Sequence, residues 1–199
     1  MVTIREKLEK SRTGREIQTV ERRKLDMPFI SLAGYTCSGK MTLFNRPASE
    51  SKEESPKLFT TLTTTTRVIS FSDAGKKVML SDTVGFISRL PTYLVESFKS
   101  TLDELTYANL VFLILDVSEE VGSIRVKLGS CRETLNELNV DPKKILLVLN
   151  KIDLLKEGSR DRIEEDHIFK EFATVKIPAV RGDGLRKLRN RILEQTFRQ

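Results

Sequence analysis

The sequence predicts a three-layer α/β domain whose mostly parallel six-stranded sheet contains one antiparallel hairpin strand. Apolar runs of strand length alternate with segments of helical spacing. Two of these runs, 110–116 and 144–150, are apolar almost throughout, as expected of strands that are covered on both faces. One hairpin signal, with a glycine in its turn at 73–75, comes early in the chain.

The expected elements follow in order. Residues 1–27 are predicted to form a charged helical linker or arm fragment, and residues 28–199 the folded domain. Strands are expected at 29–34, 67–72, 77–81, 110–116, 144–150 and 174–178. Residues 41–45 are expected to begin one helix, and four further helices are expected at 92–106, 122–139, 160–172 and 184–197. A loop is expected at 48–57.

Composition indicates a protein of the cytoplasm. The 199 residues suit one hydrophobic core, and no apolar run approaches the ~20 residues of a membrane span. The charged N-terminus does not resemble a signal peptide. The two cysteines, Cys37 and Cys131, form no disulfide framework and fit a reducing compartment.

Charge is concentrated at the two ends of the chain. The net charge is +6, and residues 1–28 and 181–199 are both basic. Basic ends suit a polyanionic partner such as RNA. Ordinary solvated helix faces are the alternative explanation, which charge alone favours.

The first motif is GYTCSGKM, which matches the phosphate-binding pattern G-x-x-x-x-G-K-S/T except at its last position. The glycines allow the backbone to fold around phosphates, and consecutive N–H groups with the following helix N-terminus hold the negative charge. Lys40 would reach the β- and γ-phosphates. The predicted phosphate-binding residues are Gly34, Tyr35, Thr36, Cys37, Ser38, Gly39, Lys40, Met41 and Thr42.

The second motif is SDTVGF, directly after an apolar strand. Asp82 at the strand end could hold Mg²⁺ through water, and the N–H of Gly85 could contact a γ-phosphate. Thr83 and Val84 complete this nucleotide-binding segment. A single D-x-x-G occurs often by chance, and its position about 40 residues after Lys40, across a hairpin, favours the functional interpretation.

The third motif is NKID, at the carboxyl end of a buried strand, where ligands bind in open parallel sheets. Asp153 could accept hydrogen bonds from the N1–H and the amino group of guanine, which adenine does not offer, and this excludes ATP. Asn150 would brace the loops, and Lys151 would pack over the base, with Ile152 between them. The order of the three motifs is that of the GTPases.

In finer detail the chain resembles the HflX family of ribosome-associated GTPases. The resemblance rests on DTVGFISRLPTYLVESFKSTLDE, LAGYTCSGK and LFTTLTTTTR, and it covers about residues 28–197. It implies GTP or GDP and Mg²⁺ as ligands, and the large ribosomal subunit with its rRNA as partner. A monomer without a DNA partner is expected. Residues 1–26 look like the end of an arm that, in the family, joins an N-terminal domain.

The resemblance also implies roles for residues outside the three motifs. Thr61 aligns with the switch threonine that approaches Mg²⁺ and the γ-phosphate, beside Phe59 and Thr60; Thr60 is the alternative. Ala179, between Pro178 and Val180, aligns with the alanine that contacts guanine O6. Lys40, Thr61 and Gly85 are the implied catalytic residues, and Thr61 and Asp82, with the position of Met41, the implied metal site.

Departures from the family pattern predict weakened chemistry. Met41 replaces a direct Mg²⁺ ligand, and a thioether is a poor partner for a hard cation. Cys37 replaces an asparagine that helps to hold a monovalent cation in related GTPases. Pro178 replaces a serine, and Thr63 an aspartate. We therefore expect weak Mg²⁺ binding and slow turnover. The alternative is a pseudo-GTPase, a guanine-nucleotide-sensing module that docks on RNA or ribosomes without turnover.

Overall fold

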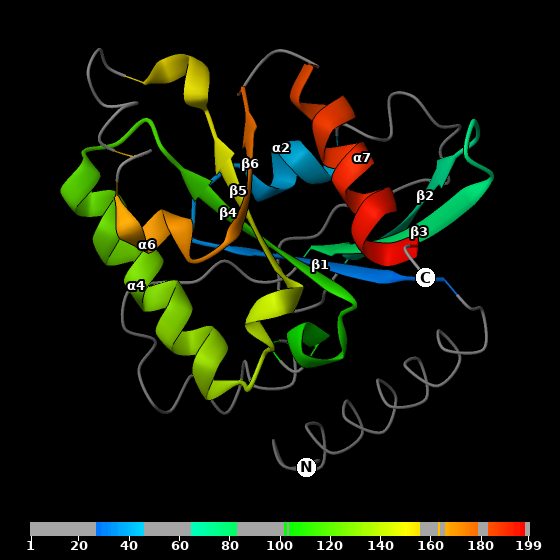
Figure 1. Ribbon diagram of the computed structural model, residues 1–199, viewed down its shortest axis with the longest axis horizontal. Helices are drawn as coiled ribbons and strands as arrows, with labels where there is room; N and C mark the ends of the chain where they lie inside the picture. Colours follow the sequence, from blue (N-terminus) through cyan, green and yellow to red (C-terminus); the bar gives the residue numbers. More distant parts are fainter. Residues whose placement is uncertain are drawn as a thin grey trace, which may run out of the picture.

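Six strands form one sheet in the computed structural model of the protein. The structure describes residues 27–45, 65–82, 102, 104–155, 163, 166–178 and 183–197. The strands are β1 (Phe29–Gly34), β2 (Thr65–Phe71), β3 (Lys76–Asp82), β4 (Leu110–Asp116), β5 (Ile145–Asn150) and β6 (Ala173–Ile177). They lie side by side in the order β2-β3-β1-β4-β5-β6 (Figure 1).

All strands except β2 run parallel, and β2 pairs antiparallel with β3. The turn between this pair contains Gly75 at a φ of 60°, which glycine adopts without steric cost. Parallel neighbours require long crossover connections, which place helices over the faces of the sheet. The predicted fold class is confirmed.

Helices lie on both faces of the sheet (Figure 1). On one face lie α2 (Lys40–Asn45) and α7 (Asp183–Phe197), and on the other lie α4 (Val121–Glu137) and α6 (His167–Lys170). Two single-turn 3₁₀ helices, η2 (Pro142–Lys144) and η3 (Ile152–Leu154), flank β5. Leu102 and residues 104–107 are also helical. The sheet is therefore the middle of three layers.

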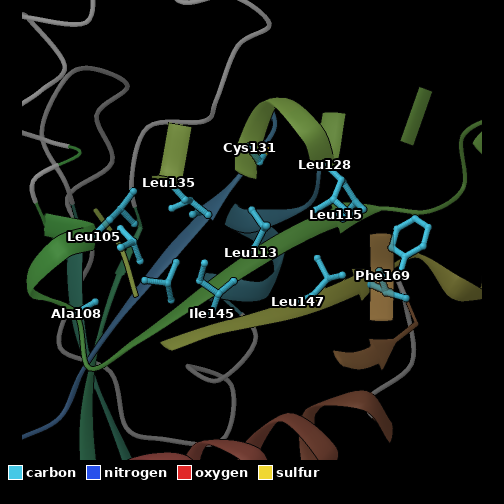
Figure 2. Close-up of a cluster of buried hydrophobic side chains, with 14 of the residues drawn as sticks. Leu105, Ala108, Leu113, Leu115, Leu128, Cys131, Leu135, Ile145, Leu147 and Phe169 are labelled. Atoms are coloured by element: carbon cyan, nitrogen blue, oxygen red, sulfur yellow. The ribbon is translucent and has the colours of Figure 1, made fainter. Parts of the chain in front are cut away.

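The central strands bury apolar side chains on both faces because successive residues point to opposite sides of a sheet. In β4, Leu113 belongs to a cluster that includes Leu128 of α4 (Figure 2). Its neighbours Phe112 and Ile114 belong to a second cluster, which includes Leu188 of α7. This double burial explains why β4 is almost entirely apolar, and it holds the end of the strand in a fixed place.

The predicted helix at 160–172 is wrong as a continuous element. Asp166 has an extended backbone, and its side chain accepts a hydrogen bond from the N–H of Ile168. Aspartate is a preferred residue at this N-cap position because it satisfies one of the free N–H groups of a helix start. The helix that Asp166 begins, α6, ends at Lys170.

Other boundaries shift slightly. The hairpin strands β2 and β3 extend beyond the predicted 67–72 and 77–81 at their N-termini, β6 ends before Pro178, and α4 ends at Glu137. Residue 144 lies in η2 rather than in a strand. Of the helix predicted at 92–106, the structure describes residue 102 and 104–106, which are helical. The predicted arm and the loop at 48–57 lie outside the described residues. No helix within the described residues is long and apolar enough to span a membrane.

Candidate functional site

Five parallel strands end at the same edge of the sheet, and predicted site residues lie at or after four of these ends. The strand register places Gly34 beside Ile114 and Asp116 beside Asn150. Asp82 ends β3, which pairs with β1. In open parallel sheets this carboxyl edge is where ligands bind. The fold therefore brings together the described parts of the three sequence motifs.

The loop between β1 and α2 follows a path that two glycines allow. Gly34 has a φ of 144° and Gly39 a φ of 93°. A Cβ atom on Gly34 would lie 2.3 Å from the carbonyl oxygen of Ile114, and one on Gly39 would lie 2.2 Å from the side-chain nitrogen of Asn150. Larger residues at either position would clash, so the loop depends on both glycines.

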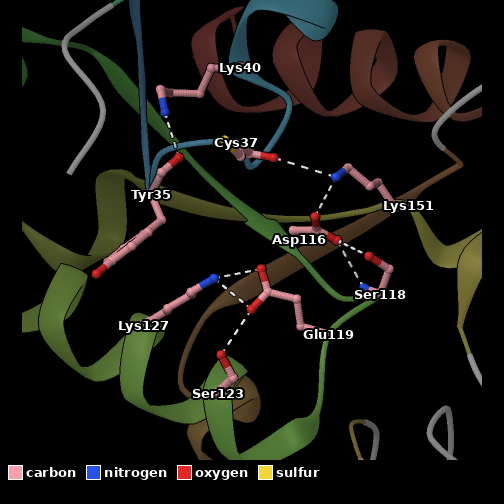
Figure 3. Close-up of polar contacts among 9 residues, drawn as sticks. All are labelled: Tyr35, Cys37, Lys40, Asp116, Ser118, Glu119, Ser123, Lys127 and Lys151. Carbon is pink, nitrogen blue, oxygen red and sulfur yellow. Dashed lines mark hydrogen bonds and ion pairs between the residues drawn. The ribbon is translucent and has the colours of Figure 1, made fainter. Parts of the chain in front are cut away.

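Lys40 begins α2 and turns its side chain back over this loop. Its Nζ donates a hydrogen bond of 2.9 Å to the carbonyl oxygen of Gly34. It donates a second, of 2.7 Å, to the carbonyl oxygen of Tyr35 (Figure 3). Burial lowers the pKa of Lys40 below the usual 10.5, and the nearby carboxylate of Asp82 opposes this shift. An ammonium group bonds more strongly to a charged oxygen than to neutral carbonyls, so Lys40 is suited to receive an anion at the loop.

Asn150 connects the end of β5 to the phosphate loop. Its side-chain nitrogen donates a hydrogen bond of 2.9 Å to the carbonyl oxygen of Ser38. Its own backbone carbonyl accepts from the N–H of Val117 at 3.1 Å. Asn150 is 6% exposed, and a buried amide with these bonds holds its neighbours in one arrangement. The predicted bracing role thus has the contact it requires.

Lys151 reaches the same loop from the next position of the chain. Its Nζ lies 3.4 Å from the carbonyl oxygen of Cys37, and it forms an ion pair with Asp116 at the end of β4 (Figure 3). The Asp116 carboxylate also accepts two hydrogen bonds from Ser118. Asp116 was not among the site residues predicted from the sequence. Its position could have indicated it, because Asp116 is an acidic residue that ends an apolar strand at the carboxyl edge of the sheet.

A second polar group missed from the sequence lies beside the loop. Lys127 of α4 is 5.1 Å from the centre of the Tyr35 ring, a cation–π distance. The same ammonium pairs with both carboxylate oxygens of Glu119, at 2.5 Å each, and Glu119 also accepts from Ser123 (Figure 3). The segment after β4 therefore contacts the phosphate loop through α4.

Asp82 has the properties expected of a group that holds a cation. Its Oδ1 is buried and has no hydrogen-bond partner among the described residues. Burial raises the pKa of Asp82 above the usual 3.8, and Lys40 partly offsets this shift. A buried carboxylate oxygen without a partner is costly unless it gains a ligand. Asp82 therefore fits a site for a hard divalent cation such as Mg²⁺.

Met41 does not fit such a site. The residue is 59% exposed, on the first turn of α2 directly after Lys40. Its thioether sulfur is a soft ligand, which Mg²⁺ does not prefer. Thr42 carries a hydroxyl and is also exposed, but one residue along a helix rotates the side chain by about 100°. The described residues contain no group of three or more acidic, cysteine or histidine side chains that could hold a metal.

The remaining predicted residues divide into described and undescribed sets. Asp153 is exposed in η3, Ile152 is half-buried against the core cluster of α4, and Pro178 is half-buried just after β6. Thr36 is exposed on the phosphate loop. Eight predicted residues lie outside the described part of the chain: Phe59, Thr60, Thr61, Thr83, Val84, Gly85, Ala179 and Val180.

Comparison with known proteins gives one matching family, described as 50S ribosome-binding GTPase, over residues 29–151. This range begins at β1 and ends in the NKID motif, so it contains the phosphate loop, Asp82 and Asn150.

Curated relatives match over most of the chain. It is 43% identical over 161 residues to GTPase HflX of Thermococcus kodakarensis, an alignment that covers 81% of this chain and 36% of the relative. It is 39% identical over 166 residues to GTPase HflX of Escherichia coli, covering 83% of this chain and 38% of the relative. The chain thus spans less than half the length of these relatives.

A similar solved structure is that of a GTP-binding protein from the hyperthermophilic archaeon Sulfolobus solfataricus in complex with GDP. It superimposes with a TM-score of 0.68 at 30% sequence identity, and the match covers 96% of this chain and 59% of that one.

Proposed function

Because this chain belongs to the 50S ribosome-binding GTPases, as a G domain of the HflX type, we propose that it binds guanine nucleotides and hydrolyses GTP to GDP and phosphate. The observation that carries the proposal is the junction between two loops. Gly39 leaves room for the Asn150 side chain, whose amide bonds the carbonyl of Ser38. Two segments more than a hundred residues apart are thereby held as one rigid support, as recognition of a phosphate chain and a base by one site requires.

Each part of the support has a task in this proposal. The loop N–H groups and Lys40 would hold the phosphates, and Lys40 would exchange its bonds to the Gly34 and Tyr35 carbonyls for bonds to charged oxygens. Asp153 would select guanine, and Lys151 would pack over the base. The similar Sulfolobus solfataricus protein was solved with GDP, which supports guanine as the base.

Hydrolysis would proceed by attack of water on the γ-phosphate, and this chain's residues would contribute mainly positioning and positive charge. Lys40 is the described residue that supplies charge, with Thr61 and Gly85 proposed from the family resemblance. A bound Mg²⁺ would neutralise charge on the phosphates. Asp82 would hold the ion, with Thr61 at a second position.

The Met41 position is expected to limit this chemistry. With an exposed thioether where a hydroxyl would ligate Mg²⁺, binding of GTP should be weakened more than binding of GDP, since the γ-phosphate adds charge that the ion must neutralise. We expect slow turnover that depends on high Mg²⁺ concentration.

Phosphate release from GTP by the wild type, Met41→Thr and Met41→Leu across a series of Mg²⁺ concentrations tests this proposal. Threonine restores the ligand, so its rate should exceed the wild-type rate by about tenfold or more. Leucine resembles methionine in size and, like methionine, offers no oxygen ligand, so the rate of Met41→Leu should equal that of the wild type. Equal, brisk rates in all three proteins would overturn the impairment. Thermal shifts with GDP, GTP and ATP, each with and without Mg²⁺, test guanine binding separately.

The exposed thioether of Met41 also favours a second candidate, a nucleotide-sensing module that docks on RNA or ribosomes without turnover. This candidate predicts tight GDP binding and no phosphate release at any Mg²⁺ concentration, even with ribosomes added. The family description names the 50S subunit, and the exposed Arg186, Lys187 and Arg191 of α7 would suit rRNA. Cosedimentation with isolated 50S subunits at low and high salt tests this partner.

A further inference from the structure

We propose that Asp116 is a positioning residue for the nucleotide, which holds the side chain of Lys151 in its place over the base-binding edge before the nucleotide arrives. The inference rests on the proposed function, and it concerns a residue outside the three sequence motifs. Asp116 ends β4, between the strands that lead into the phosphate loop and the NKID loop.

The Asp116 carboxylate is itself fixed in orientation. Its Oδ1 accepts hydrogen bonds from the backbone N–H of Ser118 at 2.9 Å and from the Ser118 hydroxyl at 2.6 Å. This leaves Oδ2 for the ammonium of Lys151 (Figure 3). One oxygen anchors the group to its own loop, so the other presents a negative charge at a defined point of the sheet edge.

The environment makes the ion pair stronger than one at the open surface. The side chain of Asp116 is 11% exposed and that of Lys151 27%. Burial alone would raise the pKa of Asp116, but hydrogen bonds from Lys151 and Ser118 lower it below the usual 3.8. The carboxylate is therefore ionised at neutral pH, and partial burial reduces the screening of the pair by water.

A fixed partner for the Lys151 side chain offsets two unfavourable features of this residue, its backbone conformation and the freedom of its side chain. Its backbone has a φ of 64°, in the left-handed region, which is unfavourable for residues other than glycine. Its long side chain has many rotamers, and freezing them on binding reduces affinity. With its Nζ held between Asp116 and the carbonyl of Cys37, the chain is ordered in advance, so the nucleotide gains the contact at a smaller entropic cost.

A cycle of variants in the full chain tests the proposal, with GDP affinity measured by isothermal titration calorimetry. Asp116→Asn removes the charge and keeps the shape, and it should weaken GDP binding about three- to tenfold, the effect of leaving one long side chain unordered. Lys151→Met should weaken binding at least as much. In the Lys151→Met background, Asp116→Asn should change the affinity by less than about twofold, because its effect acts through Lys151.

The matched control is Asp73→Asn, which removes the carboxylate from a different ion pair, the one between Asp73 and Arg189. Asp73 lies in the turn after β2, far from the carboxyl edge of the sheet. It should leave GDP affinity unchanged. An equal loss from Asp116→Asn with and without Lys151 would show a general structural role and overturn the proposal. Unchanged GDP affinity in Asp116→Asn would also overturn it and leave the proposed function intact. Failure of the wild type to bind GDP would overturn both.

Ser118→Ala gives an independent test if Asp116→Asn does not fold. It removes only the hydroxyl that orients Oδ1 and keeps the backbone bond. GDP affinity should fall below that of the wild type, and this loss should disappear in the Lys151→Met background. A loss that persists without Lys151 would contradict the assigned path from Asp116 through Lys151 to the nucleotide.

Discussion

Two residues of the candidate site hold unfavourable backbone conformations, and they contact each other. Among the described residues, the non-glycine residues with positive φ are Cys37, Asn139 and Lys151. Asn139 follows α4, where asparagine in this conformation is a common helix ending. Cys37 and Lys151 lie in the two loops of the site, and the Lys151 ammonium approaches the Cys37 carbonyl at 3.4 Å. Such strain is retained where the surrounding contacts over-determine it, which is frequent at functional sites.

Asp82 is expected to destabilise the nucleotide-free protein. Its folded pKa lies above the usual 3.8 because of burial, so ionising this group is harder in the folded than in the unfolded state. The penalty is absent below the unfolded pKa, grows as pH rises, and is complete above the folded pKa. Asp82→Asn, which carries no charge, should therefore have the higher unfolding temperature at pH 7, and the difference should vanish near pH 3.5.

Thermal unfolding of the two proteins between pH 3.5 and pH 7, without nucleotide or divalent cation, measures this effect. Glu133→Gln is the control for loss of a carboxylate, because Glu133 is an exposed residue of α4, and this variant should unfold at nearly the wild-type temperature at pH 7. A wild type that is the more stable protein at pH 7 would contradict the prediction. Addition of GDP with Mg²⁺ should reverse the order, since a bound cation would give the Asp82 oxygen its missing partner.

At the scale of single elements, α2 is too short to be stable alone, and a neighbouring strand supports it. The helix has six residues and no basic residue in its last turn, whereas isolated helices of this length do not persist in water. Arg67 of β2 donates to the carbonyl oxygen of Phe44 at 3.2 Å and to the side chain of Asn45 at 3.3 Å. Its guanidinium also lies 4.5 Å from the centre of the Phe44 ring. Arg67 thus caps the carboxyl end of α2.

Arg67→Met should lower the free energy of unfolding by about 1–2 kcal/mol, because it keeps the aliphatic stem and removes charged hydrogen bonds to a helix end. Urea unfolding measures the loss. Arg132→Met serves as control: Arg132 pairs with Glu171 at the surface, with the two side chains 42% and 53% exposed, and an exposed pair contributes less than about 1 kcal/mol. Equal losses in the two variants would mean that the cap adds nothing beyond a surface contact.

Elements were predictable from the sequence where local pattern determines them. The apolar runs of β4 and β5 could be assigned because strands covered on both faces need apolar residues at every position. The helix at 160–172 was mispredicted because an aspartate in a polar segment fits a helix interior and an N-cap equally well in sequence. In the structure the backbone of Asp166 is extended, so this residue is the N-cap of α6 and not part of a helix interior.

At the scale of the whole molecule, the sequence predicts which segments form the site but not the side chains that join them. Order and spacing of three motifs on an α/β pattern place them at one sheet edge. The pairs between Asp116 and Lys151, and between Arg67 and α2, connect positions 35 and about 23 residues apart. No periodicity encodes such contacts, since they depend on the order β3-β1-β4-β5 and on rotamers.

The proposed domain boundary near residue 28 gives a prediction for the whole fold. The described contacts of the sheet begin at Met27, which packs against the core cluster of α4. The carbonyl of Pro28 accepts from the N–H of Met79 at 2.8 Å, and Phe29 exchanges two 2.8 Å hydrogen bonds with Asn109. A protein of residues 27–199 should therefore keep its free energy of unfolding, measured in urea, within about 0.5 kcal/mol of that of the full chain. Its affinity for GDP should equal that of the full chain.

A protein of residues 30–199 is the matched comparison, because it lacks three further residues that carry these contacts. It loses the buried Phe29 ring and the hydrogen bonds at the start of β1, so it should be destabilised by about 3 kcal/mol or more. Because β1 lies between β3 and β4 and leads into the phosphate loop, this loss should also weaken GDP binding. If the 27–199 protein were destabilised as strongly as the 30–199 protein, the domain boundary would have to lie within residues 1–26, and the charged N-terminal segment would belong to the folded domain.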